Sequence, residues 1–159
     1  MAEALRDALA LPLLAKDALK ETLGGVLETR GRSDSRLLGV AVFALLGELV
    51  RELLPAGVSL IVEGNFVAGT PVFASLPPAR IVQVHVTADP EVLRARLLAR
   101  DAHRHPVHYD REAADEIADR AGRGEWVPLP LEGELIAVDT RGRVDVAALV
   151  ERVRATARL

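Results

Sequence analysis

The stretch that decides the fold runs from residue 80 to residue 100 and reads RIVQVHVTADPEVLRARLLAR. Its first part, Arg80 to Val86, is rich in valine and isoleucine, which is typical of a β-strand. Asp89 and Pro90 then form a helix start, because Asp is a preferred N-cap and Pro is favoured at the first helical position. A helix is therefore expected from Glu91 to Arg100, directly after a strand.

The same alternation of strand and helix continues on both sides of this stretch. Apolar runs that are short enough to be strands lie at residues 11–15, 58–62 and 135–138. Strands that alternate with helices predict an α/β fold with a parallel sheet. We expect a single domain over residues 1–159, in which helices flank the sheet to form three layers.

Five further helices are expected, and two of them are at residues 2–10 and from about Asp110 to Arg120. Of the other three, the first runs from Asp17, placed as its N-cap, to about Glu28, and the last is capped by Asp145. The longest begins after Ser33 or Asp34 and ends near residue 54. Because its first half is apolar on nearly every side, we expect it to be buried.

The composition excludes several classes of function. The chain has 159 residues, 50% of them hydrophobic and only 3% aromatic, so its core must consist mainly of Leu, Val and Ala. A net charge of -3 argues against a nucleic-acid or membrane-surface binder. The absence of cysteine excludes disulfides, thiolate metal sites and a cysteine nucleophile. The N-terminus lacks the layout of a signal peptide, and the longest uncharged apolar run, residues 37–47, is too short to span a bilayer, so we expect a cytoplasmic protein.

Polar residues follow the ends of the predicted strands, where ligands bind in open parallel sheets. These residues are Lys16-Asp17, Glu63-Gly64-Asn65, Thr87 to Asp89 and Asp139-Thr140. Asp89 is best explained as a helix cap, whereas Asp17 is as consistent with capping as with chemistry. Glu63 has no capping role, so a carboxylate at the end of an apolar strand calls for an arginine, a ligand hydroxyl or a metal-bound water as partner.

A second group of candidate residues is cationic. Arg96, Arg100 and Arg104 are spaced by four, so they share one face if the helix continues, and neighbouring guanidiniums favour a polyphosphate between them. The alternative is a solvated face whose arginines pair with nearby carboxylates.

A metal site is a third hypothesis for this region. It would use His103, His105 and His108 together with Asp110. The histidine spacing is not a strong zinc signature, and Arg104 in its middle is a poor neighbour for a dication, so no metal ligand is assigned.

Five pieces of the chain, in this order, resemble the small-molecule and nucleotide kinases of the P-loop NTPase fold. They are LPLLAKDALKETL (11–23), LIVEGNF (60–66), IVQVHVTADPEVLRARLLARD (81–101), RHPVHYD (104–110) and IAVDT (136–140). The most similar group is the AAA-domain kinases related to zeta toxins and chloramphenicol phosphotransferase. The resemblance implies ATP-dependent phosphorylation of a small hydroxyl-bearing molecule, with ATP and Mg²⁺ as cofactors.

The resemblance also implies roles for individual residues. Asp17 would orient or deprotonate the acceptor hydroxyl, and Glu63 would lie near magnesium or the acceptor. Arg100 and Arg104 would clamp the transferring phosphate as part of a lid at about residues 101–120, which Arg96 precedes. The remaining substrate-binding candidates are Lys16, Asn65 and His108.

The chain departs from this family at its first motif. Family members begin with a strand, the phosphate-binding loop G-x-x-x-x-G-K-[ST] and a helix, whereas nothing here matches that loop and neither lysine follows a glycine. We therefore expect impaired kinase activity, with a non-catalytic module that binds a phosphorylated ligand or a protein partner as the alternative. Without the first strand, residues 58–62 either close directly onto residues 81–86, are completed by a partner or a second copy at the open edge, or leave the domain marginally stable.

Overall fold

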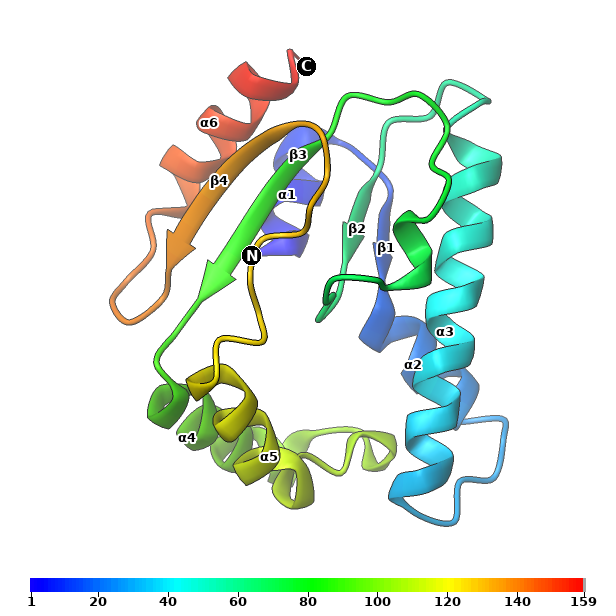
Figure 1. Ribbon diagram of the computed structural model, residues 1–159, viewed down its shortest axis with the longest axis vertical. Coiled ribbons are helices and arrows are strands. Elements are labelled where there is room, and N and C mark those ends of the chain that lie inside the picture. The colour runs from blue at the N-terminus through cyan, green and yellow to red at the C-terminus, as the bar shows by residue number, and fades with distance from the viewer. Residues whose placement is uncertain (159) are drawn as a thin grey trace.

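The computed structural model describes residues 1–158 as helices packed around four short strands (Figure 1). The helices are α1 (Ala2–Leu9), α2 (Lys16–Gly24), α3 (Arg32–Leu53), α4 (Pro90–Arg100), α5 (Asp110–Gly122) and α6 (Val146–Ala157). The strands are β1 (Leu13–Ala15), β2 (Ile61–Glu63), β3 (Val82–Thr87) and β4 (Glu134–Asp139). Three single turns of 3-10 helix complete the structure: η1 (Pro71–Phe73), η2 (Asp101–His103) and η3 (Pro106–His108).

The strands form two separate parallel pairs rather than one continuous sheet. β1 pairs with β2, with Leu13 opposite Ile61, and β3 pairs with β4, with Val82 opposite Glu134. All four strands point toward the end of the molecule where α2, α4 and α5 lie (Figure 1). The predicted mixed α/β architecture with parallel strands is confirmed. Within residues 1–158, however, β2 and β3 do not pair, so direct closure between these two strands does not occur.

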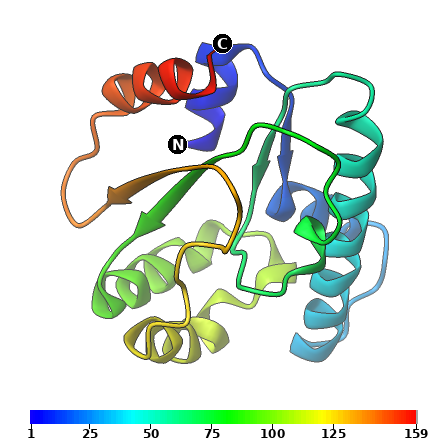
Figure 2. The same ribbon diagram turned by 45° about the horizontal axis from the view of Figure 1, so that its top comes forward.

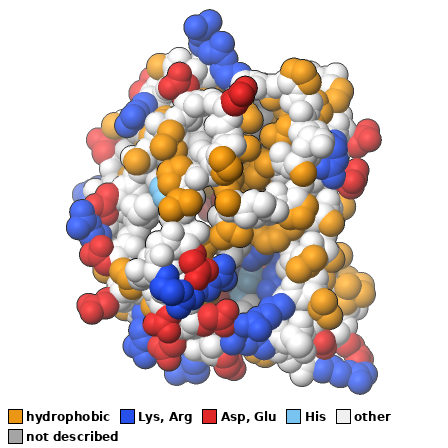
Figure 3. Space-filling view, in the orientation of Figure 1, with side chains coloured by type: hydrophobic (Ala, Val, Ile, Leu, Met, Phe, Trp, Pro, Cys, Tyr) orange, Lys and Arg blue, Asp and Glu red, His pale blue; other side chains and the backbone are white. Residues whose placement is uncertain are grey.

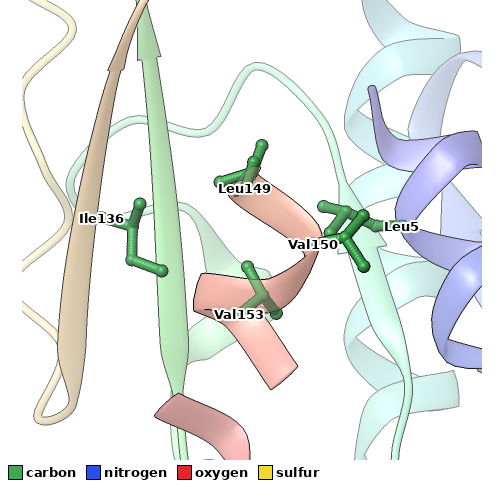
Figure 4. Close-up of a cluster of buried hydrophobic side chains, with 5 residues drawn as sticks. All are labelled: Leu5, Ile136, Leu149, Val150 and Val153. Atoms are coloured by element: carbon green, nitrogen blue, oxygen red, sulfur yellow. The ribbon is translucent and has the colours of Figure 1, made fainter. Parts of the chain in front are cut away.

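One hydrophobic core joins the two strand pairs from a single side. Its buried members, Leu5, Ile136, Leu149, Val150 and Val153, come from α1, β4 and α6 (Figure 4). α1 and α6 pack against each other on this side of the strands (Figure 2). A second core, built around Val42, Leu46 and Val72, joins α3 to η1. The helices therefore hold the two pairs together although no strand hydrogen bonds do so.

The longest helix differs from its prediction. The start and end of α3 agree with the sequence pattern to within three residues, but the helix is not buried on every side. Leu37 and Val40 are 70% and 67% exposed, while Val42 and Leu46 are fully buried. The prediction of burial was wrong because an uncharged sequence cannot indicate which face of a helix meets a neighbour.

The predicted helix caps have mixed outcomes. Asp145 accepts a hydrogen bond from the backbone N–H of Ala148 and caps α6 as expected (3.0 Å). Asp89 occupies the N-cap position of α4 without a side-chain bond. Asp17 is not a cap, because α2 begins one residue before it, with Ala15 at the N-cap position. α2 also ends at Gly24, four residues before the predicted end.

The strand expected over residues 58–62 is shorter than predicted. β2 covers only Ile61–Glu63, and none of its residues is fully buried. Burial on both faces was predicted from a continuous apolar run, but β2 has a neighbouring strand on one side only. No helix within the described residues is both long and apolar enough to cross a membrane.

Candidate functional site

A cluster of charged side chains lies where β1 runs into α2, at the carboxyl ends of β1 and β2. Asp17, in the first turn of α2, is at its centre. Its Oδ1 accepts a hydrogen bond from Lys16 Nζ at 2.9 Å, and its Oδ2 accepts one from Arg104. Arg104 lies between η2 and η3, so residues far apart in the chain meet at this point.

Arg104 connects three carboxylates. Besides its bond to Asp17, its Nη1 lies 3.2 Å from Glu21 Oε1, and its Nε lies 3.7 Å from Asp110 Oδ2. The Nε atom is buried and is the one buried side-chain N or O within residues 1–158 that has no hydrogen-bond partner. An unpartnered guanidinium N–H in such a site is suited to an anionic oxygen.

The neighbouring charges set the acidity of the two strand-end carboxylates. Partial burial acts to raise the pKa of Asp17, but the charges of Lys16, His108 and Arg104 outweigh it and lower the pKa below its usual value. Burial, followed by repulsion from Asp17, raises the pKa of Glu63 above its usual value. Glu63 ends β2 opposite Ala15, the last residue of β1, and Asp17 follows Ala15 by two residues in α2.

A series of buried hydrogen bonds between α2, α3 and η3 supports the cluster. Lys20 is only 6% exposed, and its Nζ donates to Ser35 Oγ at 2.7 Å. Ser35 Oγ in turn donates to the backbone carbonyl of Val107 at 2.5 Å, which ties α3 to η3. His108 Nε2 lies 2.8 Å from Glu21 Oε1, and burial lowers the pKa of His108.

Sequence reasoning missed Lys20 and Glu21. A signal for them was present, because they follow Asp17 by three and four residues and therefore lie on the same face of a helix. That signal was not used, since Asp17 was considered as a possible cap rather than as part of a helical face.

The predicted arginine face does not form. α4 ends at Arg100, so Arg104 is not on the same helix. Arg100 Nε bonds Asp110 Oδ2 at 2.6 Å and stays close to Arg104, which contacts the same carboxylate. Arg96 instead donates from Nη1 to Thr140 Oγ1 at 2.9 Å and from Nη2 to its carbonyl at 2.5 Å, beyond the end of β4.

Of the remaining candidate residues, two belong to the charged cluster and one lies outside it. Lys16 and His108 belong to the charged cluster, and Lys16 Nζ also lies 5.9 Å from the centre of the Phe43 ring. Asn65 is exposed beyond β2. The part of the chain that the structure describes contains no group of three or more His, Asp or Glu side chains able to hold a metal, so it does not support the alternative of a histidine metal site.

A pocket of about 210 Å³ opens beside the half-buried Arg104. It is lined by Asp101, Arg104, His105, Pro106, Tyr109, Asp110 and Glu112. Tyr109 adopts a left-handed backbone conformation (φ 52°), which bulky residues rarely take and which recurs at functional sites. The pocket thus places the Arg104 side chain next to a small space at the start of α5.

A crystal structure of a "putative kinase" from Chloroflexus aurantiacus J-10-fl, at 1.70 Å resolution, is similar to this chain. The two are 34% identical, the match covers 98% of this chain and 89% of that one, and the TM-score is 0.85. The chain belongs to the same family as that protein. Its fold is kinase-like.

The other comparisons add no finer classification. No protein-family model matches the chain. No curated protein matches it either.

Proposed function

We propose that this kinase-like domain is a phosphotransferase that acts on a small hydroxyl-bearing molecule at the Asp17–Arg104 cluster. The observation that carries the proposal is Arg104, which lines a pocket while its guanidinium binds Asp17, a carboxylate of lowered pKa. The similarity to a "putative kinase" supports the same class of reaction.

The chemistry of phosphoryl transfer suits this set of residues. Such reactions depend mainly on positioning and on neutralising the phosphate charge, rather than on a strong base. Asp17 accepts hydrogen bonds from Lys16 and Arg104, and its lowered pKa makes it a group that orients an acceptor hydroxyl more than one that deprotonates it. Arg104 donates to phosphoryl oxygens, and Arg100 adds a second positive charge next to it.

The resemblance to P-loop kinases implies ATP and Mg²⁺, which would supply the phosphoryl group and neutralise part of its charge. The residues present fit these cofactors in part. Arg104, which lines the pocket, suits a phosphate oxygen, and Glu63 offers the hard oxygen atoms that Mg²⁺ prefers. No glycine-rich loop followed by lysine is found in the sequence, so we infer that ATP binds weakly.

Calorimetric titration with Mg·ATP tests the binding half of this proposal. We expect binding to the wild-type chain, and a loss of at least tenfold in affinity for the double variant Arg100→Ala, Arg104→Ala. Arg123→Ala is the matched control, because Arg123 is exposed and pairs only with Glu125, away from the cluster. Equal affinity in the double variant and the wild type would show that these arginines bind no phosphate.

Hydrolysis of ATP, with water as the acceptor, tests the transfer half. Asp17→Asn keeps the shape of the side chain but removes its charge, so we expect turnover to fall at least tenfold while the affinity for Mg·ATP changes little. Turnover that is unaffected by this substitution would exclude Asp17 from the reaction.

A second candidate function is a non-catalytic module that binds phosphorylated ligands. The absence of a match to the phosphate-binding loop favours it. Under this alternative, pyrophosphate raises the melting temperature and the double arginine variant loses that shift, but no ATP is consumed.

A further inference from the structure

We propose that Ser35, held by Lys20, is a positioning residue for Arg104, and that it acts by fixing Val107 in the segment that carries this arginine. We call residues 104–108 the η3 segment. The inference deepens the proposed function and rests on it, because Arg104 is the residue that binds phosphate there. Ser35 and Lys20 are not among the residues that line the pocket, so both act through Arg104.

Arg104 needs such support because its backbone lies in a connection rather than in a long helix or a strand. It lies between η2 and η3, which are single turns of 3-10 helix. Holding a long arginine side chain in one arrangement costs conformational entropy. Basic and histidine side chains are visible in the recess between α2 and α5, so this region is open to solvent and to an anion (Figure 3). The position of Arg104 opposite Asp17 therefore depends on what holds the η3 segment.

The η3 segment is fixed at Val107, which is 1% exposed. The Val107 side chain packs on α2 at Gly24, where a Cβ would lie only 2.7 Å from Val107 Cγ2. The Val107 carbonyl accepts a hydrogen bond from Ser35 Oγ at 2.5 Å, and its N–H donates to His105 Nδ1 at 3.2 Å. Arg104 precedes Val107 by three residues, so fixing Val107 limits the range over which Arg104 can move.

Lys20 determines the direction in which the Ser35 hydroxyl points. An ammonium group has three N–H donors and no acceptor. Because Lys20 Nζ lies 2.7 Å from Ser35 Oγ, this oxygen accepts from the ammonium, and the hydroxyl proton is left for the carbonyl of Val107. Ser35 and Lys20 are 3% and 6% exposed, so water does not compete for these bonds. The hydroxyl therefore holds Val107 in one fixed geometry.

One face of α2 receives both the guanidinium group and the residues that fix the η3 segment. This face has residues at intervals of three and four, namely Asp17, Lys20, Glu21 and Gly24. Asp17 and Glu21 bind Arg104 directly. Lys20 and Gly24 contact the residues that fix the segment. The separation between Asp17 and Arg104 is therefore set along a single helix.

A double-mutant cycle tests whether Ser35 acts through Arg104. Calorimetry measures the affinity for inorganic pyrophosphate of the wild type, Ser35→Ala, Arg104→Ala and the double variant. We expect Ser35→Ala to weaken binding at least threefold and Arg104→Ala to weaken it more. Added to Arg104→Ala, the serine substitution should have no further effect, because no guanidinium group is left to position. The same loss from Ser35→Ala in both backgrounds would overturn the inference.

Three further variants separate lost positioning from lost stability. Val42→Ala truncates a fully buried side chain on the same face of α3, so it should lower the melting temperature but leave the affinity for pyrophosphate unchanged. Ser35→Thr keeps the hydroxyl and should retain most of the affinity. Lys20→Met leaves the Ser35 hydroxyl free to turn away from Val107, so it should weaken binding in the wild-type background but not in Arg104→Ala. This second cycle gives the same test if Ser35→Ala does not fold.

The titration of Asp17 distinguishes failure of this inference from failure of the proposed function, because it needs no ligand. Arg104 contributes to the lowered pKa of Asp17. In carboxyl-carbon NMR, Ser35→Ala should therefore raise the pKa of Asp17, and the double variant should raise it no further than Arg104→Ala does. A wild type that binds no pyrophosphate would overturn the proposed function, and the titration then decides the inference by itself. An Asp17 pKa that is the same in Ser35→Ala and the wild type would overturn the inference.

Discussion

Buried Lys20 predicts an unusual dependence of stability on pH. The residue is 6% exposed, and its ammonium group bonds one neutral hydroxyl, that of Ser35. Burial, with repulsion from Lys16 and Arg104, lowers the pKa of Lys20 from 10.5 to about 8, and attraction from Asp17 and Asp110 opposes this only in part. The folded state therefore holds this proton less tightly than the unfolded state does.

The magnitude follows from the difference between the two pKa values. It is 10.5 minus about 8, or about 2.5, and each unit corresponds to about 1.4 kcal/mol, so charged Lys20 costs the fold about 3 kcal/mol below pH 8. Between pH 8 and pH 10.5 the unfolded state binds more protons than the folded state. Stability therefore rises with pH in this window, and the cost disappears above it.

Urea unfolding of the wild type and of Lys20→Met at several pH values measures this effect. Taking the difference between the two proteins cancels the titration of every other group that they share. Relative to the variant, the free energy of unfolding of the wild type should rise by about 1 kcal/mol between pH 7 and pH 9 and by about 2 kcal/mol between pH 7 and pH 10. A difference that stays constant or falls over this range would refute the reasoning, and would mean that Asp17 and Asp110 fully compensate the buried charge.

Three further predictions concern packing and capping. Gly24→Ala should destabilise the protein by about 1–3 kcal/mol, because a Cβ there would meet Val107 Cγ2 at 2.7 Å. Gly25→Ala, where a Cβ has no contact under 3.5 Å, should be neutral or slightly stabilising. Chemical denaturation of both variants measures the difference. Leu46→Ala should lower the free energy of unfolding by about 2–5 kcal/mol since the side chain is fully buried, and a loss below 1 kcal/mol would contradict the assigned core. Asp145→Ala should cost about 1 kcal/mol through loss of the α6 cap, seen as a fall of about 2–4 °C in melting temperature, and Asp145→Asn should restore most of it.

The order of helices and strands was largely predictable because it depends on local signals. The strand at residues 82–87 and the helix that starts at Pro90 followed from neighbouring residues alone, as did the cap at Asp145. The wrong predictions concern properties that depend on contacts between residues far apart in the sequence. The exposed side of α3, at Leu37 and Val40, depends on which elements pack against the helix, and these lie elsewhere in the chain.

The candidate site was predictable by residue type but not by grouping. Lys16, Asp17, Arg104 and His108 were all named from the sequence, and they lie together. The spacing of the arginines also suggested that Arg96 belongs with Arg100 and Arg104. Arg96 binds Thr140 instead, because α4 ends at Arg100 and a helix face cannot continue through a loop.

The sequence by itself determined that this is an α/β chain with charged residues at the ends of its strands. These properties come from apolar periodicity and capping residues, which act within a few residues of each other. Only the tertiary structure decided that Asp17 meets Arg104, 87 residues away, and that β2 and β3 face each other without pairing. Both outcomes depend on how α1, α6 and the segment from η2 to η3 pack, because contacts between distant residues form only when the helices bring them together.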